Sequence, residues 1–175
     1  LKISKNRFKE TKKIKYHPIY DNPPDGDISV DAVTGTAMLI DREKLKLIND
    51  WDTNIFNYFE DMDLCLRFRL KGFEIIKIRN AEVDHDAFSS HDENFSKQMD
   101  FSRNWHYSWS SFYFLKKHTT IFNAYKFGIS LFLKSIIKSA FYIFFKRSKS
   151  ITHFAKAYGI FFAILNLKSK YRPKI

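Results

Sequence analysis

Three carboxylates fall within four residues of this chain, at Glu60, Asp61 and Asp63. Clustered carboxylates repel one another, so such a cluster persists where a helix N-terminus, a cation or a chemical task offsets the repulsion. One interpretation is a helix cap, in which Asp61 and Asp63 accept hydrogen bonds from free N–H groups. The other is a general base at the rim of a pocket, which takes a proton from a hydroxyl group. The spacing alone leaves both interpretations open.

A histidine and a glycine give two further signals, each weak by itself. His85 lies between two aspartates, where a neutral imidazole could bind a metal ion. A surface histidine fits the same residues, and His91 lies close by. Residues 34–37 interrupt an apolar run, and Gly35 would either let a ligand approach the backbone or form a β-bulge.

The elements that must position these residues alternate between strands and helices. The sequence predicts, in order, a strand over residues 30–40, a helix over 42–48, a helix from 61 or 63 to 71, a buried strand over 73–78 and a short strand over 81–85. Asp41 caps the first helix, and Gly72 ends the second at its C′ position. An aromatic-rich loop, 49–58, joins the two helices.

From residue 97 onward the pattern is helical. Apolar side chains recur at intervals of three and four, at Phe101, Trp105, Trp109, Phe112 and Leu115. A second helix is expected over 123–145, with a narrow polar stripe on a surface rich in Phe, Leu and Ile, and a last apolar segment over 155–167.

The order of these signals resembles the second half of the catalytic domain in family-two glycosyltransferases of the GT-A fold, especially the rhamnosyltransferase-like group. The matching runs are VTGTAMLI at 33–40, residues 51–56, YFEDMDLCLR at 58–67 with Gly72, and AEVDH at 81–85. The resemblance covers roughly residues 30–118. It implies an α/β fold: the C-terminal portion of a GT-A (nucleotide-diphospho-sugar transferase) domain, followed by an α-helical extension.

The resemblance also implies a role for each residue of the site. Asp61 would be the catalytic base of an inverting sugar transfer from a nucleotide-sugar donor to a hydroxyl of a glycan or lipid-linked glycan. Glu60 would position that acceptor, and His85 would bind the Mg²⁺ or Mn²⁺ that neutralises the leaving diphosphate. The sugar pocket would be lined by Gly35, Thr36 and Ala37, with Trp51 nearby, while Asp63 and Arg67 would support the same helix as a cap and an ion-pair partner.

Two departures from the family pattern bear on domain organisation. The donor-binding half and its Asp-x-Asp motif would precede the strand at residue 30, and residues 1–29 do not supply them. The family's Gly-Phe-Asp-Glu run is replaced here by NDWD at 49–52. We therefore expect the C-terminal part of a larger enzyme: a basic lead-in (1–28), the acceptor-side half (29–118) and a basic, Phe-rich amphipathic region (119–175).

The net charge of +11 comes from the two ends of the chain. Residues 18–100 hold eighteen acids against nine basic residues, whereas no acid follows Asp100 and fourteen Lys and Arg do. A basic end rich in Phe and Ile points to an anionic membrane surface before nucleic acid. A single cysteine, Cys65, excludes an internal disulfide framework.

The helix expected over 123–145 is long enough to span a bilayer, but Lys134 and Lys138 lie near its middle. Attachment in the bilayer interface is favoured over a soluble packing helix and over a span. The expected location is cytoplasmic, peripheral on the inner face of the cell membrane. The alternative function is a non-catalytic basic module that binds acidic lipid or nucleic acid, with the carboxylates acting as a cap.

Overall fold

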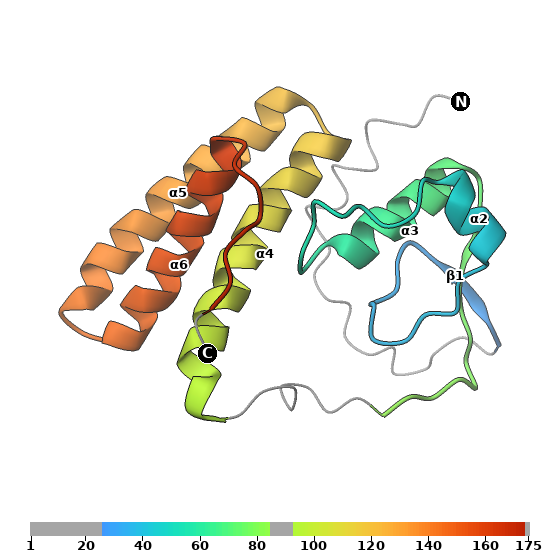
Figure 1. Ribbon diagram of the computed structural model, residues 1–175, viewed down its shortest axis with the longest axis horizontal. Coiled ribbons are helices and arrows are strands. Elements are labelled where there is room, and N and C mark those ends of the chain that lie inside the picture. The colour runs from blue at the N-terminus through green and yellow to red at the C-terminus, as the bar shows by residue number, and fades with distance from the viewer. Residues whose placement is uncertain (1–25, 85–92, 174–175) are drawn as a thin grey trace.

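The computed structural model describes residues 26–84 and 93–173, which form an α/β part and a helical part (Figure 1). The α/β part contains strands β1 (Ile28–Val30) and β2 (Ile75–Lys77) and helices α2 (Arg42–Leu47) and α3 (Glu60–Leu70). The helical part contains a short 3₁₀ helix, η2 (Glu93–Phe95), and helices α4 (Ser96–His118), α5 (Ile121–Ile143) and α6 (Arg147–Ile164). Helix α4 lies between α3 and the α5–α6 pair.

The strands are shorter and more exposed than the sequence predicts. β1 and β2 pair antiparallel with Ser29 opposite Ile76, and each holds three residues. The strand expected over 30–40 is wrong beyond Val30, because residues 31–41 run through turns and irregular backbone. The buried strand expected over 73–78 is also wrong, since two of the three β2 residues are exposed. Residues 81–84 form no strand, and residue 85 lies outside the described residues.

Local signals at α2 and at the end of α3 are confirmed. Asp41 caps α2, and its carboxylate accepts hydrogen bonds from the backbone N–H of Glu43 at 2.9 Å and of Lys44 at 3.3 Å. Gly72 follows α3 with a φ of 86°, a left-handed conformation that favours glycine.

The start of α3 differs from the prediction that Asp63 caps it. The residue before the helix is Phe59, which has a φ of 68° and makes no side-chain capping bond. Asp63 is the fourth residue of α3, still in its first turn, and is fully buried. Its carboxylate therefore has a task other than capping.

Two hydrophobic cores support the two parts. In the α/β part, Ile48, Leu64 and Phe68 are buried together. In the helical part, the predicted aromatic stripe of α4 is confirmed: Trp105, Trp109 and Phe112 pack against Ala124 of α5 and against Ile160 and Ala163 of α6. The domain boundary expected at residue 118 thus falls between α4 and α5, two helices that share one hydrophobic core.

Small residues, not large ones, form the buried side of α5. Its buried positions are Ala124, Gly128, Ser135 and Ser139, which lie along one face of the helix. Ser139 and Ser150 of α6 donate hydrogen bonds to each other's backbone carbonyl at 3.0 and 2.8 Å. Of the bulky side chains of α5, Tyr125, Leu131 and Phe132 pack at the edge of the core and are partly buried, while many of the others are exposed. Across the described residues, no helix combines the length and apolarity needed to cross a bilayer.

Candidate functional site

The structure brings Asp61 and Gly35 together from positions far apart in the sequence. Asp61 lies in the first turn of α3, and its Oδ2 accepts a hydrogen bond from the Gly35 backbone N–H at 2.9 Å. Its Oδ1 accepts another from the N–H of Met62 at 2.7 Å. Thr36 and Ala37 are exposed beside Gly35. The carboxylate is thus oriented by backbone amides at the positive end of a helix dipole.

Glu60, the neighbour of Asp61, is partly buried and incompletely bonded. Its Oε2 is buried and has no hydrogen-bond partner among the described residues. Burial raises the pKa of Glu60, and the charge of Asp61 adds to the effect. An unsatisfied carboxyl oxygen of this kind can bond a hydroxyl group supplied by a ligand.

Trp51, another residue of the predicted site, is not joined to Asp61 and Glu60 among the described residues. Trp51 lies in the 49–58 loop with its ring partly exposed, and within the described part of the chain no hydrogen bond or ring contact links it to Asp61. His85, the predicted metal ligand, lies outside the described residues. No group of three or more metal-ligating side chains occurs within residues 26–84 and 93–173, so these ranges alone do not form a metal site.

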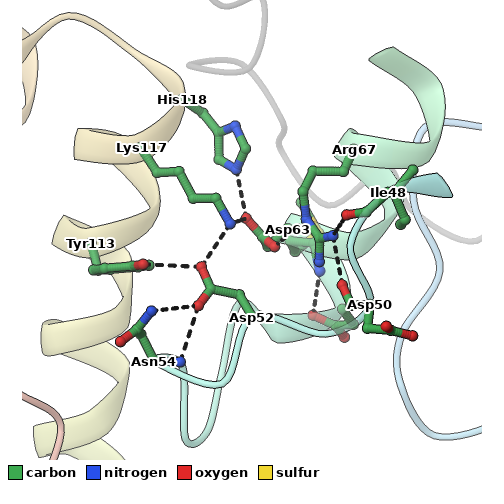
Figure 2. A network of polar contacts seen from close by, with 11 residues as sticks. Ile48, Asp50, Asp52, Asn54, Asp63, Arg67, Tyr113, Lys117 and His118 are labelled. Atoms are coloured by element: carbon green, nitrogen blue, oxygen red, sulfur yellow. Dashed lines mark hydrogen bonds and ion pairs between the residues drawn. The ribbon is translucent and has the colours of Figure 1, made fainter. Parts of the chain in front are cut away.

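Asp63 is the centre of a buried polar network, which Figure 2 shows. Its Oδ2 pairs with Nε of Arg67 at 2.7 Å, as the sequence predicted. Its Oδ1 lies 2.7 Å from both Nζ of Lys117 and Nε2 of His118, at the end of α4. Burial would raise the pKa of Asp63, but hydrogen bonds from His118, Lys117 and Arg67 outweigh it and hold that pKa well below its usual value.

A second carboxylate, Asp52, extends the network into the aromatic loop. Its Oδ2 accepts hydrogen bonds from Nζ of Lys117 at 2.7 Å and from the hydroxyl of Tyr113 at 3.0 Å. Its Oδ1 accepts two from Asn54. Burial and the bond to Asp52 raise the pKa of Tyr113 to about 12. Lys117 therefore bridges two carboxylates, one from α3 and one from the loop.

Sequence reasoning missed this connection between α3 and α4. The available signal was the basic end of α4, where Lys116, Lys117 and His118 follow the aromatic stripe. Cations are favoured at a helix C-terminus, so such a run does not by itself indicate a partner. The partners on α3 and in the loop lie 54 residues away or more, which short-range patterns do not report.

The loop before α3 is held in an uncommon backbone conformation. Tyr58 and Phe59 both have positive φ, at 64° and 68°, which is rare for bulky residues. Their rings pack against Tyr107 of α4, and Phe59 also contacts Phe114. The guanidinium of Arg67 donates to the carbonyls of Ile48 and Asp50 and fixes the start of the same loop. Helix α4 thus holds the chain that leads directly into Glu60 and Asp61.

An open cavity of about 680 Å³ lies on the α4 side of the network. Trp109, Tyr113 and Lys117 contribute to its wall, together with the segment that follows α6. Asp61 and Gly35 do not line it. The cavity is therefore separate from the carboxylate pair at the start of α3.

A comparison of the sequence with curated proteins finds one similar protein. Rhamnosyltransferase WbbL of Escherichia coli (strain K12) is 31% identical to the chain over 97 residues. The match covers 55% of this chain and 35% of that protein, so the chain spans about a third of its relative's length. No family model and no solved structure matches the chain. The chain is therefore similar to a glycosyltransferase over slightly more than half its length.

Proposed function

We propose that this chain is the acceptor-side half of an inverting glycosyltransferase of the GT-A fold and that Asp61 is its general base. The observation that carries the proposal is the different bonding of two neighbouring carboxylates. Asp63 is fully buried, and the side chains of Arg67, Lys117 and His118 all contact its carboxylate. Asp61 is partly exposed and is held by backbone N–H groups, which leaves it able to accept a proton from a ligand.

In the proposed reaction, the Asp61 carboxylate removes the proton of an acceptor hydroxyl as that oxygen attacks the anomeric carbon of the donor. The bond between that carbon and the diphosphate oxygen breaks, and the nucleoside diphosphate leaves with the bonding electrons. Attack opposite the leaving group inverts the configuration at the anomeric carbon. Glu60 would bond a neighbouring acceptor hydroxyl through its unpartnered oxygen, while Gly35, Thr36, Ala37 and Trp51 would face the sugar.

The donor in this proposal is a nucleotide-activated hexose or deoxyhexose, and the name of the relative makes rhamnose the first sugar to test. The acceptor is a glycan or a lipid-linked glycan, reached from the cytoplasmic face of the membrane. A bound Mg²⁺ or Mn²⁺ would neutralise the leaving diphosphate. His85 is the proposed ligand of this metal ion.

A donor panel tests the proposal. The protein encoded by the complete natural reading frame would be incubated with nucleotide-diphospho-hexoses and deoxyhexoses, rhamnose included, and with a glycan acceptor. We expect one donor to be consumed, with sugar transferred in proportion to the nucleoside diphosphate released and with an inverted anomeric centre by NMR. A folded protein that consumes no donor, or one that transfers with retention, would overturn the proposal.

A further inference from the structure

Helix α5 presents its largest apolar side chains to solvent. Along the side opposite its buried small residues, five positions spaced seven, four, four and seven apart form what we term the α5 face: Phe122, Ile129, Leu133, Ile137 and Phe144. Each is at least half exposed, from 50% at Ile129 to 85% at Phe144. Single exposed apolar residues are ordinary, but a contiguous patch marks an interaction surface.

The apolar surface continues from α5 onto α6. An apolar hollow of about 220 Å³ lies between the two helices and includes Phe132 and Ile136 of α5 and Phe154 and Phe161 of α6. Ile136 and Phe154 are themselves 40% and 51% exposed. The exposed surface is thus broader than one helix.

The charge around this surface has one sign. Lys126, Lys134 and Lys138 of α5 are exposed, and no acid follows Asp100 in the sequence. Lys138 also lies near Lys149 and Lys156 of α6, close enough that all three, after burial, contribute to lowering the pKa of His153. The basic groups of a protein partner with mixed charge would have no acidic groups to pair with on this surface. An anionic lipid surface could pair with each of these lysines.

We propose that the α5 face docks on the surface of an anionic lipid bilayer, with its apolar side chains among the acyl chains and with Lys134 and Lys138 reaching lipid phosphates. Side chains of lysine can extend in this way because their long stems are apolar. The helix would lie along the interface, as amphipathic helices with a basic flank do. Each lysine near such a surface strengthens binding about five-fold at moderate salt.

Vesicle flotation of the full chain tests this proposal. We expect the wild-type protein to float with phosphatidylcholine vesicles that contain phosphatidylglycerol, and to float far less with phosphatidylcholine alone or at high salt. The variant Leu133→Ser/Ile137→Ser should lose at least ten-fold in partitioning, and Lys134→Glu/Lys138→Glu at least twenty-five-fold on anionic vesicles. A matched control, Leu39→Ser/Leu47→Ser, removes two exposed leucines of the α/β part and should float like the wild type. Circular dichroism would verify that each variant keeps its helices.

Three outcomes would overturn the proposal. One is flotation of Leu133→Ser/Ile137→Ser that equals the wild type. Another is equal binding to neutral and anionic vesicles. The third is a combination of results in which the wild type does not bind vesicles and sediments as a dimer without lipid, while Leu133→Ser/Ile137→Ser sediments as a monomer. The α5 face would then join two copies of the chain.

Discussion

Asp61 and Asp63 lie on the same turn of α3, yet their surroundings assign them different tasks. Asp63 is inaccessible to solvent, and Arg67, Lys117 and His118 surround its carboxylate. Asp61 touches backbone amides and borders the exposed Gly35 segment. A proton acceptor must be reachable by its substrate, so of the two only Asp61 fits that role.

Substitution of Glu60 by glutamine should separate binding from chemistry. Because one carboxyl oxygen of Glu60 has no partner, we propose that it bonds the acceptor and not the donor. Glu60→Gln should therefore raise KM for the acceptor about ten-fold, the equivalent of one hydrogen bond to a charged group, and leave donor affinity unchanged. Initial rates at varied acceptor concentration would measure this. A variant with normal KM and reduced kcat would instead place Glu60 in the chemical step.

Burial of His106 predicts a pH-dependent loss of stability. Its ring is fully buried, and its nitrogens bond Ser169 Oγ and the Tyr171 carbonyl at 3.0 Å each. Burial lowers the pKa of His106 to about 4 in the folded protein, whereas a histidine in the unfolded chain has a pKa near 6.5. As the pH falls, the unfolded chain therefore binds a proton at this residue before the folded protein does. Stability should be complete above about pH 6.5 and should decline by on the order of 3 kcal/mol between pH 6.5 and 4.

Urea unfolding at several pH values would measure that decline. In His106→Gln the same pH range should show a flatter dependence, because the titrating group is gone while the buried side chain can still hydrogen-bond. Equal slopes in the two proteins would mean that His106 does not titrate differently on folding.

At the scale of elements, the contact between α3 and α4 depends on the pairing of the buried Asp63 with the partly exposed Lys117. Asp63→Asn removes the charge that Arg67 and Lys117 share, and because Lys117 keeps its second partner, Asp52, the substitution should cost about 3 kcal/mol of unfolding free energy. A double-mutant cycle with Lys117→Met should give a coupling of about 1–3 kcal/mol. The exposed pair of Glu43 and Lys46, 2.8 Å apart on α2, is the matched control and should give about 0.3 kcal/mol. A coupling no larger than the control's would show that the network does not hold the two helices together.

The contact between α4 and α6 requires a glycine at position 159. A Cβ added there would lie 2.2 Å from the backbone carbonyl oxygen of Trp105, which cannot move without shifting α4. Alanine gains about 1 kcal/mol in helix propensity, but the forced separation should outweigh it, for a net loss of roughly 3 kcal/mol. At Gly128 the nearest atoms belong to the Phe112 side chain and not to the backbone, and they lie farther away, so Gly128→Ala should cost less. Thermal unfolding of both variants would rank them, and the opposite order would contradict the packing described.

The sequence predicted helices better than strands in this chain. Helix periodicity and caps are local, so Asp41, Gly72 and the stripe of Trp105 and Trp109 were read correctly. The apolar run at 73–78 suggested a buried strand, but among the described residues β2 pairs with β1 alone, and two of its three residues are exposed. On α5, the fully buried positions hold small residues rather than Phe or Ile, a choice that depends on how closely the helices approach.

For the site, the sequence predicted the pairing of Asp63 with Arg67, and the structure confirms it. The family resemblance implied that Gly35 and Asp61 belong to one site, and a hydrogen bond joins them in the structure, while their roles stay predictions. Asp52, Tyr113 and Lys117 were missed, because their interactions join segments more than 50 residues apart and no local pattern reports them.

At the scale of the molecule, the two parts are joined through the loop that precedes the site. Phe56 contacts His106 of α4, and the guanidinium of Arg172, after α6, lies 3.4 Å from the centroid of the Phe56 ring. The Ser110 hydroxyl donates to the carbonyl of Asn57 at 2.8 Å. The helical part therefore supports the loop that leads to Asp61, and its helix α5 lies on the side of α4 away from α3 (Figure 1).

The most direct test of this account compares Asp61→Asn with Asp41→Asn in the protein encoded by the complete reading frame. Asparagine caps a helix as well as aspartate does, so Asp41→Asn is a matched control away from the site. We predict that Asp61→Asn lowers kcat for sugar transfer about 10³-fold while the donor Kd stays within about two-fold of the wild type. The control should transfer sugar at the wild-type rate. Transfer by Asp61→Asn at the rate of the control would contradict the assignment of Asp61 as the base.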